Sequence, residues 1–132
     1  MLFQFRDADP AQLARFGAAF DELVAAVAAD DPCSITATRL SASTPSLMDQ
    51  DFQDALSEAA EAWVPGLHQR MPSGAGHDAQ ILAKVMPAGM MFIPSIGGVS
   101  HHWSEDTEEA DIVIGAQVLA TAIGNIFARA AD

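Results

Sequence analysis

Apolar residues in the first half of this chain follow two different patterns, which take turns along the sequence and constrain the fold more than any other feature. Residues 2–5 and 34–40 have the short, alternating apolar pattern of β-strands, whereas residues 10–30 and 48–63 repeat apolar residues at helical spacing. An order of strand, helix, strand, helix is typical of folds in which helices cover one face of a sheet. We therefore predict an α/β fold class, arranged as an α+β sandwich.

The helical stretches have recognisable starts and apolar faces. Asp9-Pro10 favours a helix start, because Asp caps free N–H groups and Pro lacks one, and Asp30-Asp31-Pro32 favours its end. The apolar stripe of the first predicted helix is Leu13, Phe16, Phe20, Leu23 and Val27. The stripe of the second is Met48, Phe52, Leu56, Ala59 and Trp63. We expect both stripes to face a core.

The second half of the chain is richer in loops and glycine. Residues 78–86 favour a short helix, and the apolar run at 90–94 favours a strand buried on both faces of a parallel sheet. Thr107 is the predicted N-cap of a final helix with acidic residues in its first turn. Its predicted buried stripe is Ile112, Ala116, Leu119, Ile123 and Phe127.

Composition limits the class of protein and its partners. The 132 residues are 50% hydrophobic, which suits one globular domain or part of a larger one. The formal net charge of −12 argues against nucleic acid and anionic membranes as partners. Cys33 is the single cysteine and cannot form an intramolecular disulfide, so we expect a cytoplasmic location. No signal peptide and no span of roughly twenty apolar residues is expected.

Three sets of residues are candidates for chemistry. His101 and His102 follow a Gly-rich loop after the predicted strand at 90–94, where imidazoles could bind a metal or be surface residues without a role. The loop at 74–77 could direct backbone N–H groups at an anion or be only a tight connection. Arg6, beside the first predicted strand, is by itself an ordinary edge charge. The residue types leave these alternatives open.

Three stretches resemble one family of enzymes. They are Met71-Pro72-Ser73-Gly74-Ala75-Gly76-His77-Asp78-Ala79, Met91-Phe92-Ile93-Pro94-Ser95 with Gly97-Gly98-Val99-Ser100-His101-His102-Trp103-Ser104-Glu105-Asp106-Thr107, and Leu2-Phe3-Gln4-Phe5-Arg6-Asp7-Ala8-Asp9-Pro10. Together they resemble the C-terminal part of the zinc-dependent amidohydrolases, in the subgroup of N-carbamoyl-L-amino-acid hydrolase, allantoate amidohydrolase and beta-ureidopropionase. The resemblance implies hydrolysis of a carbamoyl or ureido C–N bond, a linear amide, by metal-activated water.

The resemblance also implies roles for four residues. His101 matches the last ligand of a two-metal centre, and His102 has no comparable match. Gly76 and His77 match a pair that contacts substrate, and Arg6 matches an arginine that grips the substrate carboxylate. This match replaces the edge-charge interpretation of Arg6. No residue of this chain matches the family's general base, so no catalytic residue is assigned.

The resemblance implies that only part of such an enzyme is present. Residues 1–70 would be the second half of a ferredoxin-like lid and dimerisation domain, and residues 71–132 the last strand and helices of a metallo-aminopeptidase-like catalytic domain. The other ligands and the general base would lie upstream. We therefore expect a truncated hydrolase that is inactive alone and does not hold Zn, Mn, Co or Ni by itself. Expected partners are a second copy, an N-terminal partner half and a small carbamoyl or ureido substrate, with no nucleic acid and no membrane.

A different class of function competes with this prediction. The chain could be a non-catalytic remnant that acts as an oligomerisation module or binds a small carboxylate through Arg6, Gly76 and His77. Hydrolysis of carbamoyl amino acids with the upstream half and divalent metal would favour the enzyme.

Overall fold

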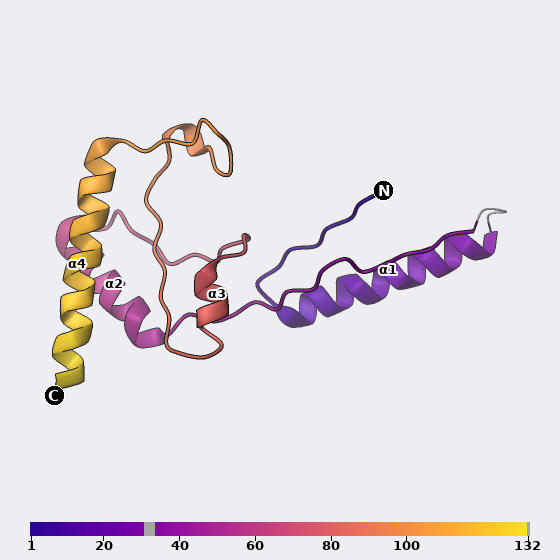
Figure 1. The fold of residues 1–132 in the computed structure, drawn as a ribbon, viewed down its shortest axis with the longest axis horizontal. Helices are drawn as coiled ribbons and strands as arrows, with labels where there is room; N and C mark the ends of the chain where they lie inside the picture. Colours follow the sequence, from indigo (N-terminus) through magenta and orange to yellow (C-terminus); the bar gives the residue numbers. More distant parts are fainter. Residues whose placement is uncertain (31–33, 132) are drawn as a thin grey trace. The chain divides into compact units, whose positions relative to one another are not determined.

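The computed structural model describes residues 1–30 and 34–131 and divides the chain into two compact units. Unit 1 consists of Met1–Ser46 together with Pro72–Gly76, and unit 2 of Leu47–Met71 together with His77–Asp132. In the described residues the regular structure is helical: α1 (Pro10–Asp30), α2 (Gln50–Trp63), α3 (Asp78–Leu82), the 3₁₀ turn η1 (Ile96–Gly98) and α4 (Glu109–Ala131) (Figure 1).

Unit 1 is built on α1 and the extended chain that runs beside it. The Asp9 carboxylate accepts a hydrogen bond from Ala11 N–H at 2.8 Å, as its predicted capping role requires. The Phe3 ring lies 5.2 Å from that of Phe20, and the Phe5 ring lies 5.8 Å from that of Phe16. These aromatic contacts cover the first half of the predicted stripe only, because Leu23 and Val27 are exposed. The predicted helix stop at Asp31-Pro32, and Cys33, lie outside the described residues.

Unit 2 has its core between α2 and α4, which pack against each other (Figure 1). The buried side chains are small: Ala55, Ala59, Ala60, Val118 and Ala122. Small side chains at a helix contact allow the two backbones to come close. At the rim, Trp63 Nε1 donates to Thr121 Oγ1 at 3.0 Å, and Arg129 Nη2 donates to Glu58 Oε2 at 2.5 Å. The order of these two pairs along the helices shows that α2 and α4 run antiparallel.

The exposed side of α2 holds an ion pair. Arg70 Nη2 donates to Asp54 Oδ1 at 2.5 Å, and Gln50 Nε2 donates to the same oxygen at 2.9 Å. The hydrogen bond from Arg70, followed by that from Gln50, holds the pKa of Asp54 below its ordinary value. The carboxylate of Asp49 caps α2 by accepting from Phe52 N–H at 3.0 Å.

The structure does not confirm the predicted fold class. Residues 2–5, 34–40 and 90–94 are extended, but none of them is a strand in the described part of the chain. A strand forms only when its N–H and C=O groups pair with a neighbouring ladder, and no partner strand is present among the described residues. The α/β sandwich is therefore not confirmed. The predicted two-sided burial of 90–94 is also wrong, because Phe92 and Ile93 are exposed.

The α4 prediction was right about the helix and wrong about its buried face. Of its buried residues, Val118 and Ala122 belong to the core with α2, and Gly115 lies against Ile93 and Met91. The predicted stripe, which includes Leu119 and Phe127, is exposed. The sequence stripe is real, but it lies on a second apolar face of the helix. The side chains of α4 that pack on α2 are small, and small side chains give a weak hydropathy signal.

Candidate functional site

Arg6 is tied to the Gly-rich loop within unit 1. Its Nη1 donates to the Gly74 carbonyl at 3.0 Å, and its Nη2 donates to Gln4 Oε1 at 3.1 Å. A guanidinium has five N–H donors, so these two bonds fix its orientation and leave donors for an anion. The structure thus brings together two of the three stretches on which the sequence prediction depends, although 68 positions separate them in the chain.

The backbone of the Gly74–Gly76 loop is open to a ligand. A Cβ built on Gly74 or Gly76 would meet no atom within 4 Å. Neither residue has a positive φ, so the turn itself does not require glycine at these positions. What glycine contributes here is the absence of a side chain above the peptide N–H groups. That is the property an anion-contacting loop needs.

His77 belongs to unit 2, where it directly precedes α3. Its backbone is extended, with φ −137° and ψ 152°, and its half-buried ring lies 5.4 Å from the Phe92 ring at an interplanar angle of 56°. The ring is therefore positioned by the extended segment at 90–94. The predicted pair is accordingly divided, with Gly76 in unit 1 and His77 in unit 2.

His101 lies in a loop that is held by two backbone hydrogen bonds. The Ile96 N–H donates to the Asp106 carbonyl at 2.8 Å, which joins the ends of the loop, and Glu105 N–H donates to the His102 carbonyl at 3.0 Å. Within it, His101 has φ 55°, in the left-handed region that non-glycine residues seldom adopt. The Glu105 carboxylate holds this conformation by accepting from His101 N–H at 2.7 Å. The exposed imidazole is thereby presented on a defined backbone.

His102 has local contacts of its own. Its Nδ1 lies 2.8 Å from Ser104 Oγ, and its ring lies 5.3 Å from that of Trp103, which is 90% exposed. The two adjacent histidines therefore differ in environment. His101 is held through its backbone, and His102 through its side chain.

The described residues do not form a complete metal site. No group of three or more His, Cys, Asp or Glu side chains converges in the part of the chain that the structure describes. A catalytic zinc needs about three protein ligands. Moreover, Glu105, the carboxylate closest in sequence to His101, is engaged by a backbone N–H. Within residues 1–30 and 34–131, His101 is therefore not joined by two further converging ligand side chains.

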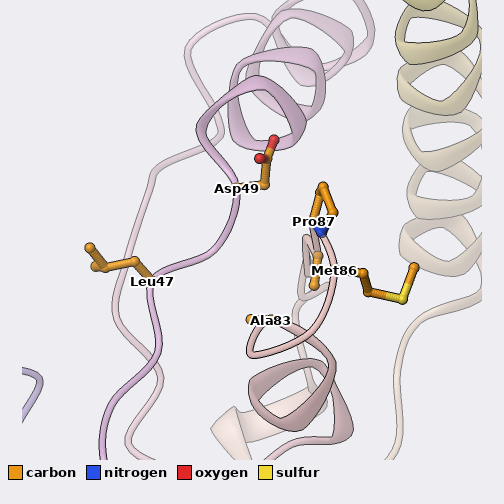
Figure 2. Close-up of a pocket in the computed structure, with 6 residues that line it drawn as sticks. Leu47, Asp49, Ala83, Met86 and Pro87 are labelled. Atoms are coloured by element: carbon orange, nitrogen blue, oxygen red, sulfur yellow. The ribbon is translucent and has the colours of Figure 1, made fainter.

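A small pocket in unit 2 is lined by none of these residues. It measures about 240 Å³ and is lined by Leu47, Asp49, Ala83, Met86, Pro87 and Ala88 (Figure 2). Small-molecule sites usually occupy roughly 300–1,000 Å³. Its carboxylate, that of Asp49, already caps α2. The pocket therefore lacks both the size and the free polar groups of a substrate site.

Comparison with known proteins identifies the family. The model of Peptidase family M20/M25/M40 matches residues 10–125. The chain belongs to this family. It is 54% identical over 50 residues to the allantoate amidohydrolase of Escherichia coli, a match that covers 38% of this chain and 12% of that protein. It is 42% identical over 66 residues to the N-carbamoyl-L-amino-acid amidohydrolase of Paenarthrobacter aurescens, covering 50% of this chain and 16% of the relative.

A solved structure agrees with this M20 assignment. The amidase of the hydantoinase/carbamoylase family from Burkholderia phymatum matches with a TM-score of 0.79 and 38% sequence identity, covering 91% of this chain. The match spans only 28% of the amidase chain. Amidohydrolases of the M20 family are generally metal-dependent. The resemblance inferred from the sequence motifs is confirmed, and this chain corresponds in length to a minor part of such an enzyme.

Proposed function

We propose that this chain forms the substrate-carboxylate and last metal-ligand segments of an amidohydrolase that cleaves the carbamoyl or ureido C–N bond. Its substrates would be N-carbamoyl-L-amino acids or allantoate-like compounds, the classes named for its relatives. The observation that supports this most is the hydrogen bond between Arg6 and the Gly74 carbonyl. It joins a preoriented guanidinium to an open glycine loop in one unit.

Arg6 and Gly76 would bind the carboxylate of the substrate. The planar guanidinium can donate two parallel hydrogen bonds to a carboxylate, and such charge-assisted pairs are stronger than neutral ones. The Gly74 carbonyl and Gln4 keep the fork from rotating freely. The Gly76 N–H, with no side chain above it, can add a further donor, and the His77 imidazole would contact the polar end of the substrate.

His101 would supply one ligand to the metal centre. The remaining ligands and the general base would come from polypeptide with no counterpart in this chain. We accordingly assign no catalytic residue here and expect no hydrolysis by the chain alone. Zinc, or another divalent metal such as Mn, Co or Ni, would be held only in the assembled enzyme.

A chimera tests the proposal. The matching 28% of the Burkholderia phymatum amidase would be replaced by these 132 residues, and hydrolysis of N-carbamoyl-L-amino acids would be measured. We expect Arg6→Gln to raise KM at least about tenfold, the loss of roughly 1.4 kcal/mol of carboxylate binding, with a smaller effect on kcat. Arg15→Gln removes the same charge from α1 and is the control. Equal KM values for the two variants would contradict the role of Arg6.

Metal content tests the role of His101 separately. In the chimera, His101→Ala should release most of the bound metal on gel filtration, whereas His102→Ala should retain it. The two variants remove the same side chain from adjacent positions of one loop. Metal retained by both, or lost by both, would argue against His101 as a specific ligand.

A non-catalytic role is the second candidate, because the described residues form no metal cluster. In that case the chain alone would bind a carbamoyl amino acid through Arg6 without metal, or would act as an oligomerisation module. Titration calorimetry of the chain with and without Arg6→Gln distinguishes this from the enzyme. A homo-oligomeric state, checked by light scattering, and a cytoplasmic location belong to the proposal.

A further inference from the structure

Helix α4 has two apolar faces, and only one of them is covered. Gly115, Val118 and Ala122 form the inner face: Val118 and Ala122 belong to the core with α2, and Gly115 lies against Ile93. The outer face consists of residues at helical spacing, all exposed: Ile112, Leu119, Ile123 and Phe127. Phe127 alone is 73% exposed. Soluble proteins seldom leave a contiguous stripe of large apolar side chains uncovered unless it is an interaction surface.

The outer face is also free of charge along most of its length. Between Ile112 and Ala128 the sequence contains no Asp, Glu, Lys or Arg. The charged residues of α4 are confined to its first and last turns, at Glu109, Asp111 and Arg129. A solvated helix face in a chain of net charge −12 would be expected to contain acidic residues. The absence of acidic residues indicates a face that is covered by another surface rather than by solvent.

We propose that the outer face of α4 docks the remaining catalytic-domain polypeptide of the amidase, which holds the other metal ligands. This proposal rests on the proposed function. The structural match supports this occupant, because the chain aligns over 91% of its length with an amidase of which it spans only 28%. The larger remainder must meet this segment somewhere, and the outer face of α4 is a long, uncharged and uncovered surface.

The position of α4 in the chain strengthens this choice. The helix begins directly after the loop that holds His101. The extended segment that precedes this loop lies against α4, where the Ile93 side chain contacts Gly115. A polypeptide seated along α4 would therefore lie close to the loop whose histidine needs further ligands. A second copy of this chain on the same face would instead add another −12 of charge to the complex and would bring no ligand beyond those already described.

Two other occupants are outcomes of the test. A second copy could pair through the same stripe. A membrane could receive α4, since its 23 residues reach a mean hydropathy of 1.6 over an 18-residue window and are long enough to span. The acidic balance and the packing of α4 on α2 favour a protein partner over a lipid surface.

Co-expression tests the docking. The full chain, with an affinity tag, would be produced together with the part of the Burkholderia phymatum amidase that it does not match. We expect the two to co-purify at equal stoichiometry, and Leu119→Glu/Ile123→Glu to reduce recovery of the amidase part at least about tenfold. Leu67→Glu/Val85→Glu changes two other exposed apolar side chains of unit 2 and should leave recovery unchanged. Circular dichroism checks that both variants remain helical, as expected because Leu119 and Ile123 lie outside the core.

Each result decides the proposal. Equal recovery with the wild-type chain and Leu119→Glu/Ile123→Glu overturns it. If the chain alone forms a homodimer and Leu119→Glu/Ile123→Glu makes it monomeric, the face is assigned to self-association. If the chain floats with phosphatidylcholine vesicles and the same variant abolishes flotation, the face is assigned to a membrane. Failure here is distinguishable from failure of the proposed function, which the covalent chimera tests without docking. An active chimera with no association of separate chains refutes only the docking.

Discussion

Gly115 on α4 offers the sharpest test of the described packing. A Cβ at this position would lie 2.5 Å from Ile93 Cγ2 and 3.5 Å from Met91 Cε, well inside normal contact for the first. Ile93 belongs to the extended segment, so Gly115→Ala must displace the Ile93 side chain, either by itself or together with that segment. Gly124, on the same helix, has no atom within 4 Å of the equivalent position and is the matched control.

Gly115→Ala and Gly124→Ala should change the free energy of unfolding by different amounts, and these changes can differ in sign. Replacing a mid-helix glycine by alanine stabilises by about 1 kcal/mol, which Gly124→Ala should gain in full. Gly115→Ala gains the same term but incurs an overpacking cost of about 1–3 kcal/mol. The difference in free energy of unfolding between the variants is therefore about 1–3 kcal/mol. At about 1–2 kcal/mol per molar urea, the midpoints should differ by roughly 0.5–3 M.

Urea titration followed by circular dichroism at 222 nm measures this difference. If Ile93 is the obstacle, Ile93→Ala should remove most of the cost of Gly115→Ala in a double-mutant cycle. Equal stability of Gly115→Ala and Gly124→Ala would refute the packing of the extended segment on α4. A cost that persists with Ile93→Ala would instead place the obstacle elsewhere.

Three further predictions concern α2 and its contacts. Asp49→Ala should lower the free energy of unfolding by about 1 kcal/mol through loss of the N-cap, whereas Asp49→Asn should be nearly neutral in thermal melts. Because its folded pKa is lowered, Asp54 stabilises the fold above about pH 4, and this contribution is lost as the pH falls through the folded pKa. Arg70→Gln should therefore flatten the acid side of the stability profile, and an unchanged profile would argue against the pair. Trp63→Phe and Thr121→Val should each cost about 1 kcal/mol, and combining them should cost no more than either alone, as a shared hydrogen bond requires.

The helices could be predicted from the sequence because their signals are local. Asp9-Pro10 fixes the start of α1 by capping and by a preset φ, and the acidic residues before Ile112 mark the start of α4 to within a residue or two. Neither signal depends on the rest of the fold. The 78–86 region likewise forms a helix, although α3 ends at Leu82 and the chain continues in turns.

The strands and the buried faces were beyond local signals. An alternating run such as residues 34–40 shows that a segment can be a strand, but only a partner makes it one. Choosing the buried face of α4 by hydropathy favoured Leu119 and Phe127, whereas the residues that pack in the core with α2 are Val118 and Ala122. Close packing of two helices rewards small side chains, which a hydrophobicity pattern ranks low.

The site residues were predicted from motifs, and the structure adds how they are held. The tie from Arg6 to Gly74 links positions that no local pattern connects. The left-handed backbone of His101, and the hydrogen bond that its N–H donates to the Glu105 carboxylate, could not be foreseen from residue types. The assignment of Arg6, Gly76, His77 and His101 as site residues remains a prediction for the experiments above.

The discontinuity of unit 1 has a consequence for synthesis of the chain. Residues 1–46 are synthesised before Pro72–Gly76, the segment that completes unit 1, which follows about thirty residues later. At roughly 5–20 residues per second, the ribosome needs about 2 to 6 s to add that interval. Throughout this time the guanidinium of Arg6 has no carbonyl of Gly74 to meet, and Phe3 and Phe5 can fold onto α1 only as an incomplete unit. A nascent chain of this kind exposes apolar surface for seconds, long enough for a chaperone to bind before unit 1 is closed.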